Sequence, residues 1–115
     1  MKYALLLLCV SLYSSQYVAG RDLYFQKGCA NCHGVQAEGS GTYPKLANNS
    51  HNSLIKNLKG FQNGKSNSQA GQIMFTFAKS LTNNELNNIS FFLSNYKKDD
   101  STKYEISDEH LGGLD

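Results

Sequence analysis

The chain has 115 residues and a formal net charge of +2, and 40% of its residues are hydrophobic. This length predicts one domain rather than several. The charge is small and no basic run stands out, so the composition excludes a dedicated nucleic-acid-binding protein.

The first twenty residues have the layout of a secretory signal peptide. Lys2 provides a short positive start, residues 4–12 form a nearly unbroken apolar run, and small residues follow at Ala19 and Gly20. We expect cleavage after Ala19 or Gly20, which makes 1–20 the signal peptide and places the mature protein in the periplasm. The alternative is an uncleaved anchor, but the apolar run falls well short of the roughly 20 residues that span a bilayer. No stable membrane anchor is therefore expected after cleavage.

The motif Cys29-Ala30-Asn31-Cys32-His33 has the C-x-x-C-H spacing that is typical of c-type haem attachment. Two thiols at this spacing can each form a thioether with a porphyrin vinyl group. The histidine is then held beneath the iron as its proximal ligand. We therefore expect one haem c, bound covalently through Cys29 and Cys32, with His33 on the iron.

Two other interpretations of the cysteine pair fit the sequence less well than a haem. A dithiol redox pair is expected beside the strands of a βαβ unit, and no strand pattern is convincing in this sequence. A zinc site needs two further ligands, of which only His33 lies at a sensible spacing. Export also agrees with a haem, because bacterial c-type haem is attached outside the cytoplasm. In a mature chain of about 95 residues, the haem would supply much of the missing core.

Met74 is the candidate for the sixth ligand of the iron. Once the signal peptide is removed, it is the sole remaining methionine, and it lies 41 residues after His33. The competitors are His51 and His110, and an open site is the third possibility. A thioether ligand stabilises ferrous iron and raises the reduction potential. A six-coordinate iron suits electron transfer better than catalysis.

Three helices can be predicted, and together they indicate an all-α fold. The first runs from about residue 22 to 29 and could be capped by Asp22. The second covers about 52–62, with Ser50 as its candidate cap. The third follows a capping box of Thr82 and Glu85, and its apolar residues recur at spacings of three and four. Residues 65–71 are expected to form a loop and 74–79 a short helical turn.

These residues resemble the class I c-type cytochromes, particularly the small monohaem periplasmic proteins of bacteria. The resemblance covers residues 20–96 and extends to one half of the dihaem cytochromes of the same class. It implies the small class I cytochrome c fold, in which three to four helices surround one covalently attached haem. It also implies that Gly20 and Tyr24, on the first helix, cross closely with Phe92 on the last.

Further site residues are implied by this resemblance. Pro44 and Leu46 match the family's P-x-L segment, in which the proline carbonyl accepts the second ring N–H of the proximal histidine. Lys65 matches a position that often carries an arginine and could meet a haem propionate. Met74, followed by an amphipathic helix, matches the sixth-ligand segment. The extension 97–115 has no counterpart in the family pattern.

The charge distribution bears on the partners that we expect. Residues 21–96 carry seven basic and three acidic side chains, a net charge of +4, whereas 97–115 carry three basic and six acidic ones, a net charge of −3. A lysine-rich face could steer a negatively charged redox partner. We expect lysines around the haem edge, which would be partly exposed near Cys29, Gly34 and Ala47; the candidates are Lys27, Lys45 and Lys79.

The leading functional hypothesis is a diffusible electron carrier that is not itself an enzyme. It would take one electron from a quinol-linked complex and pass it to a terminal oxidase or reductase. The alternative is the cytochrome subunit of a periplasmic dehydrogenase, for example one that contains a flavoprotein subunit oxidising sulfide. The acidic 97–115 extension, which a free carrier does not need, motivates this alternative. A haem-based sensor or ligand-binding protein is the third hypothesis, and it requires that Met74 leave the iron readily.

Overall fold

The computed structural model describes residues 15–98. The start of the expected signal peptide, His110 and nearly all of the acidic extension lie outside these described residues. The described chain forms an N-terminal helix over residues 15–26, followed by four further helices and their connecting loops. Those four are α2 (Cys29–His33), α3 (His51–Gln62), α4 (Gln69–Ala78) and α5 (Asn83–Ser94).

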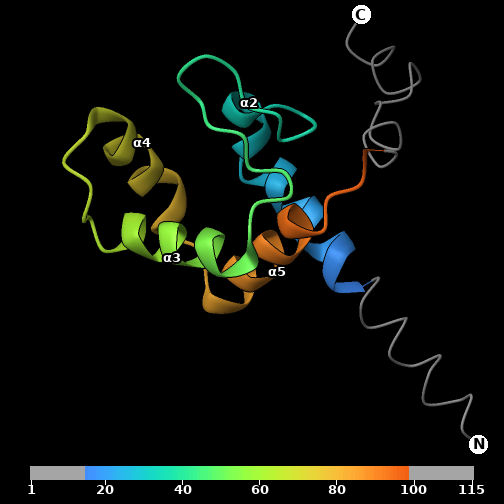
Figure 1. The fold of residues 1–115 in the computed structure, drawn as a ribbon. Coiled ribbons are helices and arrows are strands. Elements are labelled where there is room, and N and C mark those ends of the chain that lie inside the picture. The colour runs from blue at the N-terminus through green and yellow to red at the C-terminus, as the bar shows by residue number, and fades with distance from the viewer. Residues whose placement is uncertain (1–14, 99–115) are drawn as a thin grey trace, which may run out of the picture.

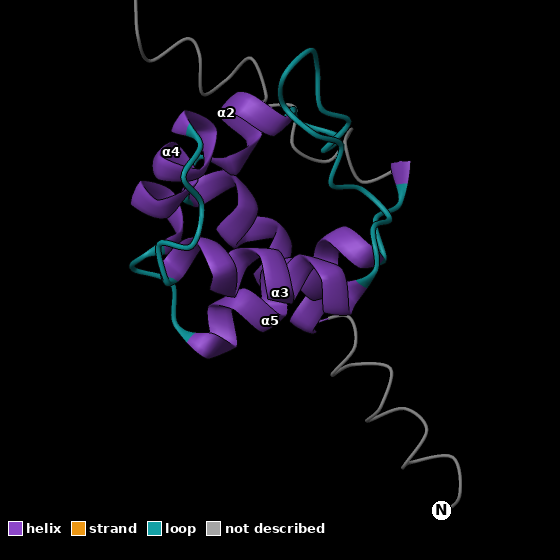
Figure 2. Cartoon of the chain, turned by 60° about the vertical axis from the view of Figure 1, so that its left-hand side comes forward, coloured by secondary structure: helices purple, strands orange, loops and turns teal. Residues whose placement is uncertain are grey.

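Figure 2 shows only helices and loops in the described part of the chain. A single isolated bridge joins Ser40 and Tyr43 within a turn. The expected all-α class is therefore confirmed. None of the helices in the described segment is both long enough and apolar enough to cross a membrane.

The N-terminal helix differs from its predicted bounds. The helix is already formed at residue 15 and continues to residue 26, so Asp22 lies inside it and does not cap it. It ends ahead of Gly28, whose φ of 81° lies in the left-handed region that side-chain-bearing residues avoid. The five motif residues then form the separate short helix α2, which the sequence pattern did not indicate.

The caps of α3 and α5 are those predicted. The Ser50 side chain accepts a hydrogen bond from the N–H of Ser53 at 3.1 Å. Thr82 and Glu85 form the complete capping box, in which each side chain accepts from the other residue's backbone N–H. Leu86, Ile89 and Leu93 face the core as expected. Tyr96, the last residue of the predicted stripe, lies beyond the end of α5.

Helix α4 begins earlier than predicted, and the loop expected over 65–71 is correspondingly shorter. Ser68 is the cap, and its hydroxyl accepts from the N–H of Gly71 at 3.0 Å. A glycine in a first turn suggests a helix breaker, but Gly71 has a packing role here. A Cβ at this position would overlap the hydroxyl of Ser66. The glycine therefore lets the preceding loop lie directly on the helix.

The core is centred on Phe92, which is 1% exposed. Its ring lies 5.1 Å from that of Tyr17, 5.7 Å from that of Tyr24 and 5.8 Å from that of Tyr96. The N-terminal helix, which carries Tyr17 and Tyr24, crosses α5, which carries Phe92 (Figure 1). A Cβ on Gly20 would overlap the backbone carbonyl of Asn88, so a glycine is required at this crossing. The close approach of the first helix to Phe92 is therefore present as expected.

The crossing also includes a residue from the expected signal peptide. Tyr17 is 8% exposed, and its hydroxyl accepts a hydrogen bond from the N–H of Lys97 at 3.2 Å. Cleavage after Ala19 or Gly20 would remove this side chain from the aromatic cluster. The boundary expected at residue 20 thus falls inside a continuous helix.

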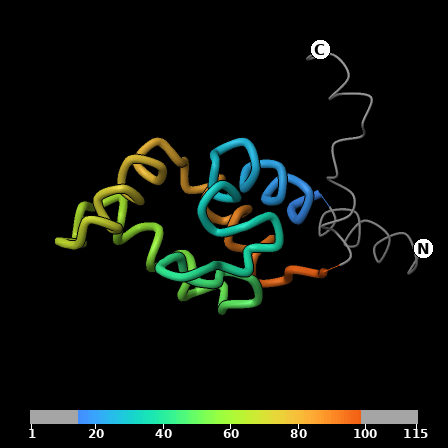
Figure 3. The backbone as a smooth tube through the Cα atoms, turned by 90° about the horizontal axis from the view of Figure 1, so that it is seen from above, coloured from blue at the N-terminus to red at the C-terminus, as the bar shows by residue number. Residues whose placement is uncertain are grey.

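Helix α3 packs against both α5 and α4. Figure 1 shows α2 and α4 on the same side of the α3–α5 pair. The view from above in Figure 3 shows the long loop after α2 passing over this arrangement before it enters α3. The backbone N–H of Asn48, at the end of that loop, donates to the carbonyl of Leu93 at 2.7 Å. The loop is therefore tied to α5 before α3 begins.

Candidate haem site

The cysteines of the motif lie on α2, where a spacing of three residues places both side chains on one face. Both are free thiols and both are half-buried. Burial raises the pKa of the Cys29 thiol to about 11, so it is protonated near neutral pH. A reactive dithiol pair needs the opposite shift, because the thiolate is the nucleophile. Cys29 is therefore a poor candidate for the nucleophile of a dithiol redox pair.

His33 is buried, with 6% of its surface exposed. Its Nδ1 lies 2.9 Å from the carbonyl oxygen of Pro44. A carbonyl can only accept, so Nδ1 carries the proton and donates this hydrogen bond. In the neutral imidazole, the other ring nitrogen, Nε2, then carries no proton and can ligate a metal. The hydrogen bond expected for Pro44 is thus present, and the imidazole is in the tautomer that a haem iron requires.

The loop from residue 34 to 47 is closed by hydrogen bonds to itself and to the motif. The N–H groups of Leu46 and Ala47 both donate to the carbonyl of Ala37, at 2.9 and 3.1 Å. The N–H of Gly39 donates to the carbonyl of His33 at 2.8 Å. Leu46 is partly buried against the core, and Ala47 is only 5% exposed. The side chain of Ala47 is therefore buried, and the haem edge expected near it stays a prediction.

Tyr24 links the N-terminal helix to the end of the motif. Its hydroxyl donates to the carbonyl of Gly34 at 2.6 Å. Burial raises the pKa of this phenol well above its ordinary value, so it remains a donor throughout the physiological range. The sequence indicated Tyr24 only as an aromatic ring at a helix crossing. No sequence signal indicated the second role, because the acceptor is brought near only by the folded path of the loop.

Met74 is half-buried and lies on the same face of α4 as the buried residues Gly71 and Ala78; we call this face the inward stripe of α4. Its neighbours Ile73, Phe75 and Phe77 are between 40% and 51% exposed. A Cβ on Gly28 would lie 3.5 Å from the ring of Phe77, so α4 reaches the turn immediately before the motif. The structure thus brings the methionine segment and the cysteine motif to one side of the molecule.

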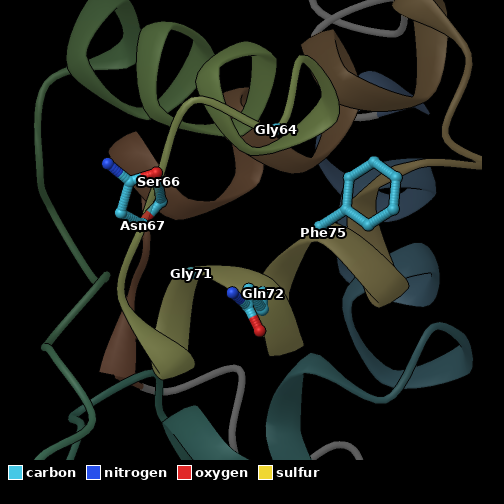
Figure 4. A pocket seen from close by; sticks show the side chains of 6 residues that line it. All are labelled: Gly64, Ser66, Asn67, Gly71, Gln72 and Phe75. Carbon is cyan, nitrogen blue, oxygen red and sulfur yellow. The ribbon is translucent and has the colours of Figure 1, made fainter.

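A hollow of about 250 Å³ lies between the end of α3 and α4 (Figure 4). Its lining residues come from the loop after α3 and from the first turns of α4: Gly64, Ser66, Asn67, Gly71, Gln72 and Phe75. None of the predicted site residues lines it. Lys65 lies in the same loop, with its side chain exposed.

The alternative ligands receive no support from the described residues. His51 is the first residue of α3 and is partly exposed. Within residues 15–98, no three or more His, Cys, Asp or Glu side chains gather in a way that could hold a metal ion, so the zinc reading lacks its further ligands there. The residues that fit a metal-bearing group are instead those of a haem site: two thiols on one helix face and an oriented imidazole beside them.

Comparison with known proteins decides the family. The model of the family described as "Cytochrome c" matches residues 17–97, which include the motif, the loop and Met74. The chain belongs to the cytochrome c family. It is a class I, monohaem c-type cytochrome with the small all-α fold of that class. Its cofactor is accordingly an iron-containing haem c, and the pattern of Cys29, Cys32 and His33 fits covalent attachment.

Two similar proteins come from bacteria. Cytochrome c-554(547) of Halothiobacillus neapolitanus is 33% identical over 87 residues, which cover 69% of this chain and 94% of that protein. Cytochrome c-552 of Acidithiobacillus ferridurans is 30% identical over 66 residues, which cover 57% of this chain and 27% of that protein. These similarities indicate that this cytochrome c is an electron-transfer haem protein rather than an enzyme.

Proposed function

We propose that this cytochrome c is a periplasmic carrier of single electrons whose haem iron is ligated by His33 and Met74. The observation that supports this most is the hydrogen bond between His33 Nδ1 and the Pro44 carbonyl. This bond leaves Nε2 for the iron and fixes the ring orientation. When bound, the haem supplies an iron that alternates between the ferric and ferrous states as it gains and loses one electron. Cys29 and Cys32 hold the group by thioether bonds.

The role proposed for Met74 follows from its chemistry and its position. A thioether binds ferrous iron well and raises the reduction potential relative to a second imidazole. Met74 occupies the inward stripe of α4, and this helix lies on the same side of the molecule as the motif. Occupation of the sixth position excludes external ligands, which suits electron transfer and not catalysis at the iron.

The surface charge supports an acidic redox partner. Lys45 and Lys79 are exposed as expected for a docking face. Lys27 is different, because its ammonium lies 3.8 Å from the carboxylate of Glu85 and is partly neutralised. We infer that the exposed lysines favour encounter with negatively charged proteins, namely a quinol-linked donor and a terminal oxidase or reductase as acceptor.

The optical spectrum of the haem-loaded protein tests the ligand assignment. Ferric haem with a methionine ligand gives a weak absorption at the red end of the visible spectrum. We expect this band in the intact protein and its complete loss in Met74→Ala, because alanine has no sulfur. Ile73→Ala, which changes the exposed neighbour on the same helix, should retain it. Absence of the band from the intact protein, or its survival in Met74→Ala, would show that Met74 is not the ligand.

A further inference from the structure

Gln62 joins three helices through one side chain. It is the last residue of α3, and its Nε2 donates to the carbonyl of Ala78 at 2.9 Å and to that of Leu81 at 2.7 Å. Ala78 is the last residue of α4, and Leu81 immediately precedes Thr82, the cap of α5. The side chain is partly buried. A single amide therefore fastens the end of α4 and the start of α5 to α3.

The chemistry of this contact admits only one orientation of the amide. A primary amide has two N–H donors on nitrogen and acceptors on oxygen. Both partners here are backbone carbonyls, which can only accept. The nitrogen must therefore face them, and both of its hydrogens are used. A carboxylate of the same shape would place an acceptor against two acceptors.

This contact acts on the segment that carries Met74. Ala78 follows Met74 by four residues, so both lie on the same face of α4, about one turn apart. The last carbonyls of a helix have no partners within the helix. The carbonyl of Ala78 accepts from the N–H of Leu81 at 3.1 Å, and Gln62 provides its second partner. Ile73, Phe75 and Phe77 of α4 remain 40–51% exposed, and α3 is the helix against which α4 packs.

We propose that Gln62 is a positioning residue for the Met74 thioether, an inference that rests on the ligation by Met74 proposed above. By fastening the carboxyl end of α4 to α3, the Gln62 amide fixes where α4 lies along its own axis and how it is rotated about that axis. The position of Met74 on α4 is fixed with it. Loss of the amide frees that end of α4 and makes the sulfur easier to displace from the iron. Gln62 does not touch the iron ligands itself.

Competition by imidazole measures this effect in the haem-loaded ferric protein. Added imidazole must displace the sulfur, so its apparent affinity reports how firmly Met74 is held. Each hydrogen bond of this kind changes an equilibrium constant roughly fivefold, so the loss of two should raise imidazole affinity by up to about 25-fold in Gln62→Leu. Gln62→Glu, which keeps the shape but not the donors, should raise it similarly. It also serves as the second variant should Gln62→Leu fail to fold.

Two controls separate positioning from general stability. Asn57→Leu removes an exposed amide from the same helix and should leave imidazole affinity unchanged. Ser50→Ala removes the cap of α3 and should lower the melting temperature without changing imidazole affinity. The proposal is overturned if the Gln62 variants melt at a lower temperature but bind imidazole as the intact protein does. If the intact protein lacks the red-end band, it is instead the ligation by Met74 that fails.

Discussion

The hydroxyl of Tyr24 makes one hydrogen bond, and its contribution to the free energy of unfolding can be measured directly. It donates to the Gly34 carbonyl, which also accepts from the N–H of Ala37 at 3.0 Å. Tyr24→Phe therefore leaves that carbonyl with one partner. The free energy of unfolding should fall by about 1 kcal/mol, the net value of one hydrogen bond, because no buried acceptor is left without a donor. Denaturant unfolding of the haem-loaded protein measures it. Tyr43→Phe, at a 47% exposed ring, is the matched control, and equal stabilities for the two variants would contradict the expectation.

At the scale of the element, the capping box of α5 predicts a pH dependence. The hydrogen bond from the Thr82 N–H holds the pKa of Glu85 below its usual value, and the nearby ammonium of Lys27 adds to this shift. A carboxylate with a lowered pKa stabilises the fold above its unfolded pKa of about 4.3, and this contribution disappears as the pH falls through the folded value.

Glu85→Ala should therefore be less stable than the intact protein by about 0.5 kcal/mol at pH 7. The difference should narrow as the pH falls below about 4, because Glu85 becomes protonated first in the unfolded state and, at lower pH, in the folded state as well. Free energies of unfolding across this pH range provide the measurement. A difference that persists undiminished in acid would show that the charge of Glu85 is not what stabilises the helix start.

The elements also show what could be predicted from the sequence. The caps at Ser50 and Thr82 were predictable, because capping depends on residues three positions apart. The start of α4 was missed, because the reason that Gly71 is tolerated is its contact with Ser66 in the folded loop. In the candidate haem site, too, what could be predicted was what a sequence motif carries. The His33–Pro44 hydrogen bond followed from family resemblance, whereas the Gln62 contacts span 16 and 19 residues and have no local signature.

For the molecule as a whole, the charge of the haem-bearing part makes a prediction about encounter rates. Residues 21–96 carry a net charge of +4, with Lys45, Lys59 and Lys79 among the exposed side chains. The rate of oxidation by ferricyanide, an anion, should fall roughly tenfold as salt rises from about 10 mM to about 0.5 M, because screening removes the attraction. A cationic cobalt oxidant should show the reverse trend. Identical salt responses for both oxidants would exclude steering by these lysines.

The hydrogen bond between the Tyr17 hydroxyl and the Lys97 N–H means that the described chain starts and finishes at one spot. Figures 1 and 3 place that spot at the opposite end of the molecule from α4. In a chain that keeps residues 15–20, a tether attached before residue 15 and one attached after residue 98 would thus leave from the same side. Either could fasten the protein to a surface or to a larger assembly while α4 stays turned outward, so immobilisation through either end should leave the Met74 side open to a redox partner.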